Sequence, residues 1–297
     1  MKLNLEMPRK TKSFLLLATL CATAFYTTGC KEKDGNEQKP AAKIKLVTNA
    51  TLGSYLADGE GNTLYLLTRD VAGNNNCTGG CAATWPIYYE AALTQDLLPT
   101  GLLLADFANI TNADGKQQTT YKGWPLYYFA PVAGGQNTRE LSGETKGEGV
   151  GAVWYVAKTD YSIMLANRQL KGLNGKNYKG DYTEGDGATQ YFTDGKGRTL
   201  YVFTRDTKNK NNFTKNDPAT DANWPVFTET LASIPSTLDK ALFGSIDVFG
   251  KKQITYKGRP LYYFGRDANR GENQGVSVPT LGVWPVAVKD LAEAPNL

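Results

Sequence analysis

Histidine is absent from this chain of 297 residues. Its absence excludes catalytic pairs and triads that use an imidazole base, and it removes a common zinc ligand and the usual haem axial ligand. We therefore predict no cofactor and no metal site. Residues 1–29 carry four cations and one anion, so the net charge of +4 falls to about +1 without them. That small charge gives no reason to expect nucleic acid as a partner.

The chain also lacks an apolar run near its start that is long enough to span a membrane. Residues 14–26 form an apolar run of about 13 residues behind a basic stretch, whereas a transmembrane helix needs ~20. The run is typical of a secretory signal peptide, which we place at residues 1–29. It ends in Gly29-Cys30, which resembles a bacterial lipobox with Cys30 as the lipidated residue. The alternative is an ordinary secretory signal with a chance cysteine.

Residues 30–43 are charged, contain proline and glycine, and show no apolar periodicity, which predicts a flexible tether. Acylation of Cys30 with palmitate-type chains would make the membrane a partner of the protein through its N-terminal lipid. The charged run after Cys30 resembles the export signals of surface lipoproteins in the Bacteroidetes group. We expect an outer-membrane lipoprotein of the bacterial cell envelope that is exposed at the surface; the alternative is an anchor that faces the periplasm.

One ten-residue stretch occurs twice: residues 120–129 return almost unchanged as residues 255–264, at an offset of 135 from Tyr121 to Tyr256. Its aromatic and β-branched residues suit a half-buried strand, and the Lys-Gly pair between them tolerates the positive φ of a tight turn. The stretch therefore predicts a β-hairpin that is used once in each of two copies of one design.

A shorter period divides each copy into two units, giving four units with tryptophans at Trp85, Trp154, Trp224 and Trp284. Short strands and Gly/Asn/Asp turns predict an all-β fold of two tandem homologous domains, each built from two hairpin units. Copy one spans residues 44–158 and copy two residues 189–290, followed by a tail at 291–297. Residues 159–188 connect the copies through a strand and a long surface loop. The alternative architecture is a single propeller-like ring of four units.

Two segments, residues 94–107 and 236–243, predict short helices, with Ser236 as N-cap of the second. Each unit carries part or all of a Tyr-x-aromatic-x-x-Asp motif. The motif residues are Tyr65, Asp70, Tyr127, Phe129, Tyr201, Phe203, Asp206, Tyr262, Phe264 and Asp267.

This motif, together with the hairpin predicted at residues 120–129 and 255–264, resembles a bacterial family of secreted-repeat lipoproteins. Leu67 replaces the central aromatic residue in unit one, and Val132 replaces the aspartate in unit two. The resemblance implies a lipid-anchored envelope protein and assigns no activity.

Cysteine is scarce, and only Cys77 and Cys81 lie beyond the predicted lipidation site. In an oxidising envelope we expect them to form a structural disulfide; the alternative is a redox-active dithiol. The motif aspartates are expected to cap the turns that follow their strands and to pair with neighbouring arginines. The alternative roles for these carboxylates are catalysis and Ca²⁺ binding.

Trp124 in the first hairpin corresponds to Arg259 in the second. A fully buried unpaired guanidinium is costly, so we expect a position that accepts both residues, and therefore Trp124, to be partly exposed, and we predict Trp124 and Arg259 as ligand contacts. The expected function is a non-enzymatic binding or structural module for an unknown envelope or extracellular ligand, glycan or protein. The alternatives are an Asp/Glu-dependent glycan hydrolase and a redox accessory protein that uses Cys77 and Cys81.

Cys30 should carry the lipid, because it follows a small residue at the end of the apolar run. Metabolic labelling with an alkyne fatty acid should label the wild-type protein and leave Cys30→Ala unlabelled. Cys21→Ala is the matched control and should be labelled as the wild type is. Equal labelling of the wild type and Cys30→Ala would rule out this assignment.

Overall fold

The computed structural model describes residues 41–296. The predicted signal peptide 1–29, the predicted lipidation site Cys30 and all but the end of the predicted tether 30–43 lie outside the described residues. Within residues 41–296, no helix is long and apolar enough to cross a membrane.

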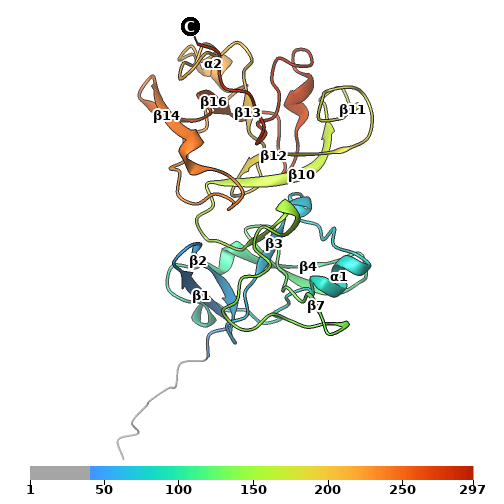
Figure 1. The fold of residues 1–297 in the computed structure, drawn as a ribbon. Coiled ribbons are helices and arrows are strands. Elements are labelled where there is room, and N and C mark those ends of the chain that lie inside the picture. The colour runs from blue at the N-terminus through green and yellow to red at the C-terminus, as the bar shows by residue number, and fades with distance from the viewer. Residues whose placement is uncertain (1–40, 297) are drawn as a thin grey trace, which may run out of the picture. The chain divides into compact units, whose positions relative to one another are not determined.

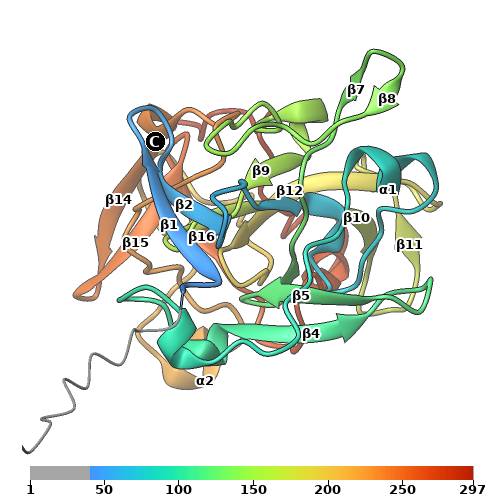
Figure 2. The same cartoon turned by 90° about the horizontal axis from the view of Figure 1, so that it is seen from below.

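Strands dominate both halves of the described chain, which confirms the prediction of an all-β fold (Figure 1, Figure 2). The strands of the first half are β1 (Ile44–Asn49), β2 (Gly53–Asp58), β3 (Tyr65–Leu67), β4 (Phe107–Thr111), β5 (Gln117–Tyr121), β6 (Trp124–Pro125), β7 (Val132–Ala133), β8 (Gln136–Asn137) and β9 (Trp154–Val156). Those of the second half are β10 (Ile163–Lys171), β11 (Asn177–Tyr178), β12 (Ala188–Asp194), β13 (Tyr201–Val202), β14 (Phe243–Val248), β15 (Lys251–Tyr256) and β16 (Arg259–Tyr262).

These strands pair antiparallel in six small sheets within residues 41–296. β3 of unit one pairs with β9 of unit two, and β13 of unit three pairs with β16 of unit four. Strands are therefore shared between the two units of a copy, and the described strands close into no barrel. β10 pairs with β12 as β1 pairs with β2, so we count β10 as part of copy two from here on.

The repeated hairpin forms where the sequence predicts it. β5 turns into β6 through Lys122 and Gly123, whose φ angles are +48° and +76°. β15 turns into β16 through Lys257 and Gly258 at +49° and +76°. Positive φ at both central residues is the geometry of the tight hairpin turn whose twist matches that of the strands.

Helices are short throughout the described chain. The α-helices are α1 (Gly80–Thr84) and α2 (Pro218–Asp221), and the 3₁₀ turns are η1 (Thr68–Asp70), η2 (Gln95–Leu97), η3 (Leu104–Asp106), η4 (Val150–Ala152), η5 (Lys240–Leu242) and η6 (Gln274–Ser277). The short helices predicted within residues 94–107 and 236–243 are 3₁₀ turns rather than α-helices, namely η2 and η3 in the first segment and η5 in the second. Pro99 and Gly101 interrupt the first segment, and both residues disfavour a helix interior. The cap of η5 is Asp239 rather than Ser236.

A pair of stacked tryptophans lies at the centre of each copy. The ring centroids of Trp85 and Trp154 are 3.7 Å apart with an interplanar angle of 5°, and those of Trp224 and Trp284 are 3.8 Å apart at 6°. Each pair takes one indole from each unit, so the two units of a copy share one aromatic core. Buried side chains of both copies also join in a continuous core, and the predicted domain boundaries remain predictions.

Trp124 corrects the prediction that it is exposed, because only 1% of its surface is accessible. Its indole N–H donates to the Gly195 carbonyl of copy two at 3.0 Å, and the Arg270 guanidinium lies 4.9 Å from its ring centroid. Arg270 also donates from Nε to the Val71 carbonyl at 2.8 Å. The tip of the first hairpin is thus packed against copy two, and Trp124 is a contact between copies.

Arg259 occupies the equivalent position in copy two and is half-buried. Its guanidinium donates to the carbonyls of Ala292 and Glu293 at 2.8 and 3.2 Å. Arg259 at the tip of the second hairpin therefore packs on the C-terminal segment, whereas Trp124 at the tip of the first hairpin packs against copy two. The two side chains occupy different environments, whereas the sequence analysis treated the two positions as equivalent.

Trp124→Ala should lower the free energy of unfolding by about 3–5 kcal/mol, because it removes a buried indole and its cation–π contact with Arg270. Arg259→Ala at the equivalent position is the matched control and should cost less, since that side chain is only half-buried. Urea denaturation of both variants beside the wild type measures the difference. A loss below about 1 kcal/mol for Trp124→Ala would contradict the packing described here.

Candidate functional site

The motif tyrosines of copy two donate hydrogen bonds to buried carboxylates in a crossed pattern. The Tyr262 hydroxyl of unit four donates to Asp206 of unit three at 2.7 Å. The Tyr201 hydroxyl of unit three donates to Asp267 of unit four at 2.5 Å. The carboxylate of each unit is therefore satisfied by the tyrosine of the other unit.

Copy one repeats the pattern with one residue that sequence reasoning missed. Tyr127 of unit two donates to Asp70 of unit one, and Tyr65 of unit one donates to Glu140 at 2.5 Å. Glu140 is buried and supplies the carboxylate that Val132, an exposed residue on β7, does not provide. The signal in the sequence is that Glu140 lies shortly before Gly147. Gly147 lies against Tyr65 as Gly275 lies against Tyr201.

The second oxygen of each motif carboxylate accepts a hydrogen bond from a backbone N–H in the loop that follows its strand. Asp70 accepts from the Asn76 backbone N–H at 2.8 Å, and Asp206 accepts from that of Asn212 at 2.7 Å. The prediction that these aspartates cap turns is confirmed. The predicted pairing with arginine is wrong for Arg69, because the described residues contain no ion pair between it and Asp70.

Burial changes the acidity of these groups. Desolvation raises the pKa of Asp70 to about 7 and those of Asp206 and Asp267 to about 6, although hydrogen bonds to each carboxylate oppose the shift. Burial likewise raises the pKa of the partner Tyr262, so its hydroxyl remains a donor. Such carboxylates would suit a general acid by pKa alone. However, both oxygens of each of these three aspartates accept hydrogen bonds from the fold.

A second tyrosine in each repeated hairpin has a similar partner. The hydroxyls of Tyr128 and Tyr263 donate to Asp58 and Asp194 at 2.8 and 3.0 Å. The other oxygen of Asp58 accepts the backbone N–H of Glu60 at 2.9 Å, as in a hairpin turn. In residues 41–296, no three His, Cys, Asp or Glu side chains gather as a possible metal site.

The aromatic third positions of the motif pack on the tryptophans. The ring centroids of Phe129 and Phe264 lie 4.5 and 4.6 Å from those of Trp85 and Trp224. Phe203 lies 4.5 Å from Trp284 by the same measure. The complete motif is thus a packing and hydrogen-bonding device around each tryptophan pair.

Cys77 and Cys81 form a disulfide in the loop after Asp70, which confirms the predicted bond. Cys77 is 3% exposed and packs in the aromatic core of copy one. In copy two Phe213 follows Asp206 at the equivalent distance, with its ring centroid 4.8 Å from that of Trp284. A ring therefore fills in one copy the place that the disulfide takes in the other.

The largest difference between the copies lies in their first hairpins. Three residues, 50–52, connect β1 to β2, whereas residues 172–187 connect β10 to β12 and contain β11. We call residues 172–187 the insertion. The register that pairs Ile44 with Asp58 pairs Ile163 with Asp194, so the insertion extends a strand pair that copy one ends early.

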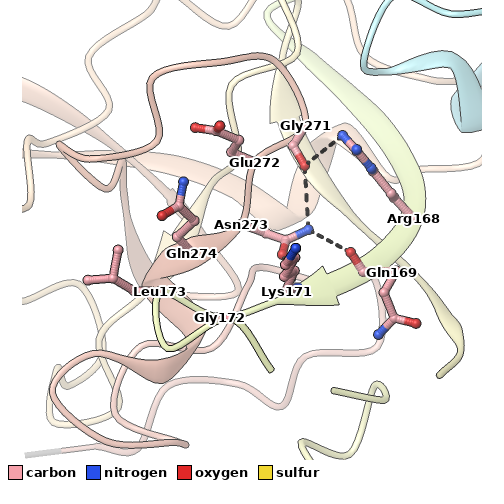
Figure 3. Close-up of a pocket in the computed structure, with 10 residues that line it drawn as sticks. Arg168, Gln169, Lys171, Gly172, Leu173, Gly271, Glu272, Asn273 and Gln274 are labelled. Carbon is pink, nitrogen blue, oxygen red and sulfur yellow. Dashed lines mark hydrogen bonds between the residues drawn. The ribbon is translucent and has the colours of Figure 1, made fainter. Parts of the chain in front are cut away.

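The insertion forms an open hollow of about 460 Å³ against the segment after Arg270 (Figure 3). Its walls come from the end of β10, the start of the insertion and residues 271–274; we call it the insertion hollow. Asn273, 2% exposed, joins the two walls: its Oδ1 accepts the Lys171 backbone N–H at 2.6 Å and its Nδ2 donates to the Gln169 carbonyl at 3.0 Å. The sequence analysis predicted only a long surface loop for the insertion.

Both repeated hairpins, and in copy two the loop with Asp267, resemble a known protein family. Residues 108–131 and 247–288 match the model of a family described as a secreted repeat of unknown function. The matched segments include β5 and β6 in copy one and β15, β16 and Asp267 in copy two, so the matches cover the hairpins that the sequence analysis singled out. No curated protein and no solved structure matches the chain.

Burial of the motif carboxylates makes the stability of the fold depend on pH. A carboxylate whose folded-state pKa is raised from 3.8 to about 6, as for Asp206, binds its proton more tightly in the native state. Its contribution to stability is therefore complete below about pH 4 and is lost as pH rises through 6. Relative to the wild type, Asp206→Asn should gain about 1–3 kcal/mol in free energy of unfolding between pH 4.5 and 7.5.

Urea denaturation at these two pH values measures the effect as a difference between wild type and variant. The control is Asp217→Asn, because hydrogen bonding by Thr220 lowers the pKa of the exposed Asp217 carboxylate. That substitution should leave the difference in stability between pH 4.5 and 7.5 almost unchanged, because a carboxylate with a lowered pKa is already ionised there in both the folded and the unfolded state. Parallel pH profiles for the wild type and Asp206→Asn would show that burial does not raise the pKa of Asp206.

Proposed function

We propose that the chain is a lipid-anchored lipoprotein of the outer membrane, exposed at the cell surface, whose folded part is a non-enzymatic binding module. The secreted character of the repeat supports an extracellular or envelope location. The apolar run that ends at Cys30 supports lipidation, and the charged residues that follow support export to the surface. We assign the ligand to the insertion hollow.

The observation that carries this proposal is that the insertion occurs in one copy only. Copy one folds the same hairpin with a three-residue turn, so the common architecture does not require residues 172–187. Long connections inside a compact fold are commonly functional. The insertion is also held in place, since the Leu173 backbone N–H donates to the Gln274 carbonyl at 3.0 Å and the Tyr182 hydroxyl accepts from the Val286 N–H at 2.9 Å.

The hydrolase alternative receives less support from the described residues. A glycosidase needs two carboxyl groups that face its substrate. The motif carboxylates are instead buried, and they accept hydrogen bonds from tyrosine hydroxyls and loop N–H groups. The redox alternative is weakened by the burial of Cys77, because a reactive thiol or disulfide is usually accessible.

Leu173→Trp tests the assignment of the ligand to the insertion hollow. Leu173 lines the hollow and is 40% exposed, so a larger ring there should obstruct the ligand at little cost in stability. Leu281→Trp is the matched control, since Leu281 is also 40% exposed and lines none of the hollows described here. The mature lipoprotein in detergent micelles is applied to an array of envelope glycans and purified outer-membrane proteins.

We expect the wild type and Leu281→Trp to bind the same array component and Leu173→Trp to lose at least tenfold in affinity. Circular dichroism and urea denaturation should show that both variants fold as the wild type does. Binding that survives Leu173→Trp unchanged would place the ligand elsewhere and contradict the assignment. Hydrolysis of any bound glycan would contradict the proposal that the binding module is non-enzymatic.

A further inference from the structure

The insertion hollow is adjacent to a second polar hollow of about 290 Å³ that reaches copy one. The two share Arg168 and Gln169 on β10 as lining residues, and the second adds Arg69 and Asn74 from the loop around η1. η1 of copy one contacts β10 of copy two, so both copies form the walls. We call the two hollows together the junction groove.

Three cations line the junction groove: Arg69, Arg168 and Lys171. All three are exposed, and none takes part in an ion pair within the described part of the chain. The Arg168 guanidinium makes one long hydrogen bond there, 3.5 Å from Nη1 to the Gly271 carbonyl. A guanidinium has five N–H donors, so most of those on Arg168 are available to a ligand.

The anionic side chain in the lining does not neutralise these cations. Both carboxylate oxygens of Glu272 accept hydrogen bonds from Asn269, one from its side chain at 2.8 Å and one from its backbone N–H at 3.0 Å. In Figure 3 the Glu272 carboxylate points away from Arg168. The groove therefore presents unpaired positive charge.

Side-chain amides complete the polar surface. Asn74 and Asn167 line the groove, and neither side chain forms a hydrogen bond within residues 41–296 that would occupy its donor and acceptor. Leu173 is the one large apolar side chain in the lining, and no aromatic ring lines either hollow. Many peptide ligands bind through apolar or aromatic anchor pockets, which this lining lacks.

We propose that the junction groove binds an acidic saccharide chain, with Arg69, Arg168 and Lys171 facing its carboxylates and Asn74 and Asn167 facing its hydroxyls. Arginine forms paired hydrogen bonds with carboxylates, and amides can both donate to and accept from hydroxyls. This inference rests on the proposed function and specifies the ligand of that site. It also explains why the cations occur on both copies, because a chain that fills both hollows must cross β10.

The probe is hexagalacturonate, and its binding to the mature lipoprotein in detergent is measured by calorimetry at about 50 mM and 300 mM salt. Arg168→Gln and Arg69→Gln should each weaken binding about tenfold, the effect of losing a charge-assisted hydrogen bond. Higher salt should weaken binding by the wild type. Arg205→Gln is the matched control, since Arg205 is the exposed equivalent of Arg69 in copy two, lines no hollow described here, and should leave affinity unchanged.

Cellohexaose, which is neutral, and a hexaglutamate peptide, which carries carboxylates on an amide backbone, are the comparison ligands. Tighter binding of hexagalacturonate than of both supports the proposal. Equal weakening by Arg205→Gln would show non-specific attraction and overturn it, as would equal or tighter binding of hexaglutamate. If cellohexaose binds and Leu173→Trp abolishes that binding, the insertion hollow remains the site and only the acidic ligand class fails.

Discussion

Crossed hydrogen bonds between tyrosine hydroxyls and buried carboxylates are the interaction on which each copy depends. A buried carboxylate without donors is costly, and here each one receives a tyrosine O–H from the other unit and a backbone N–H from its own loop. A unit taken alone would leave its carboxylate without the tyrosine donor and its tryptophan without the stacked partner ring. The smallest part that satisfies its own polar groups is therefore a pair of units, which explains why the closest sequence repeat has an offset of 135 residues and not half that length.

Duplication of this pair then allows one copy to change without loss of the shared core. The two hairpin tips have the same backbone geometry but different neighbours, so Trp124 fills a contact between copies and Arg259 covers the C-terminal segment. Phe213 takes the place of the Cys77–Cys81 disulfide for the same reason, since a ring and a disulfide can each fill the space beside an aromatic core. The insertion is the largest such change, and it adds surface without altering the tryptophan pair of its copy.

Features set by local chemistry could be predicted from the sequence, and features set by distant neighbours could not. Lys122-Gly123 specifies its turn through the backbone alone, and Asp206 caps the loop next to it in the chain. The burial of Trp124 depends on Gly195 and Arg270, more than seventy residues away, which no local pattern reveals. Glu140 was missed because the β7–β8 hairpin separates it from the motif tyrosine of its unit. The insertion hollow was missed because a glycine-rich loop does not show which wall it packs against.

Recurrence across the four units separates residues that serve the fold from residues that serve a ligand. Each unit contributes a buried carboxylate with the same kinds of donors, and a single site would not need the same group four times. Lys171 lies instead where β10 continues past the register position at which β1 ends, so copy one has no equivalent strand residue, and Arg168 corresponds to Asn49, the last residue of β1. Their charge is not neutralised by an ion pair in the described chain, and the fold of copy one shows that the architecture forms without them. Exposed cations that form no ion pair and that the fold of the other copy does not require are best explained by a ligand.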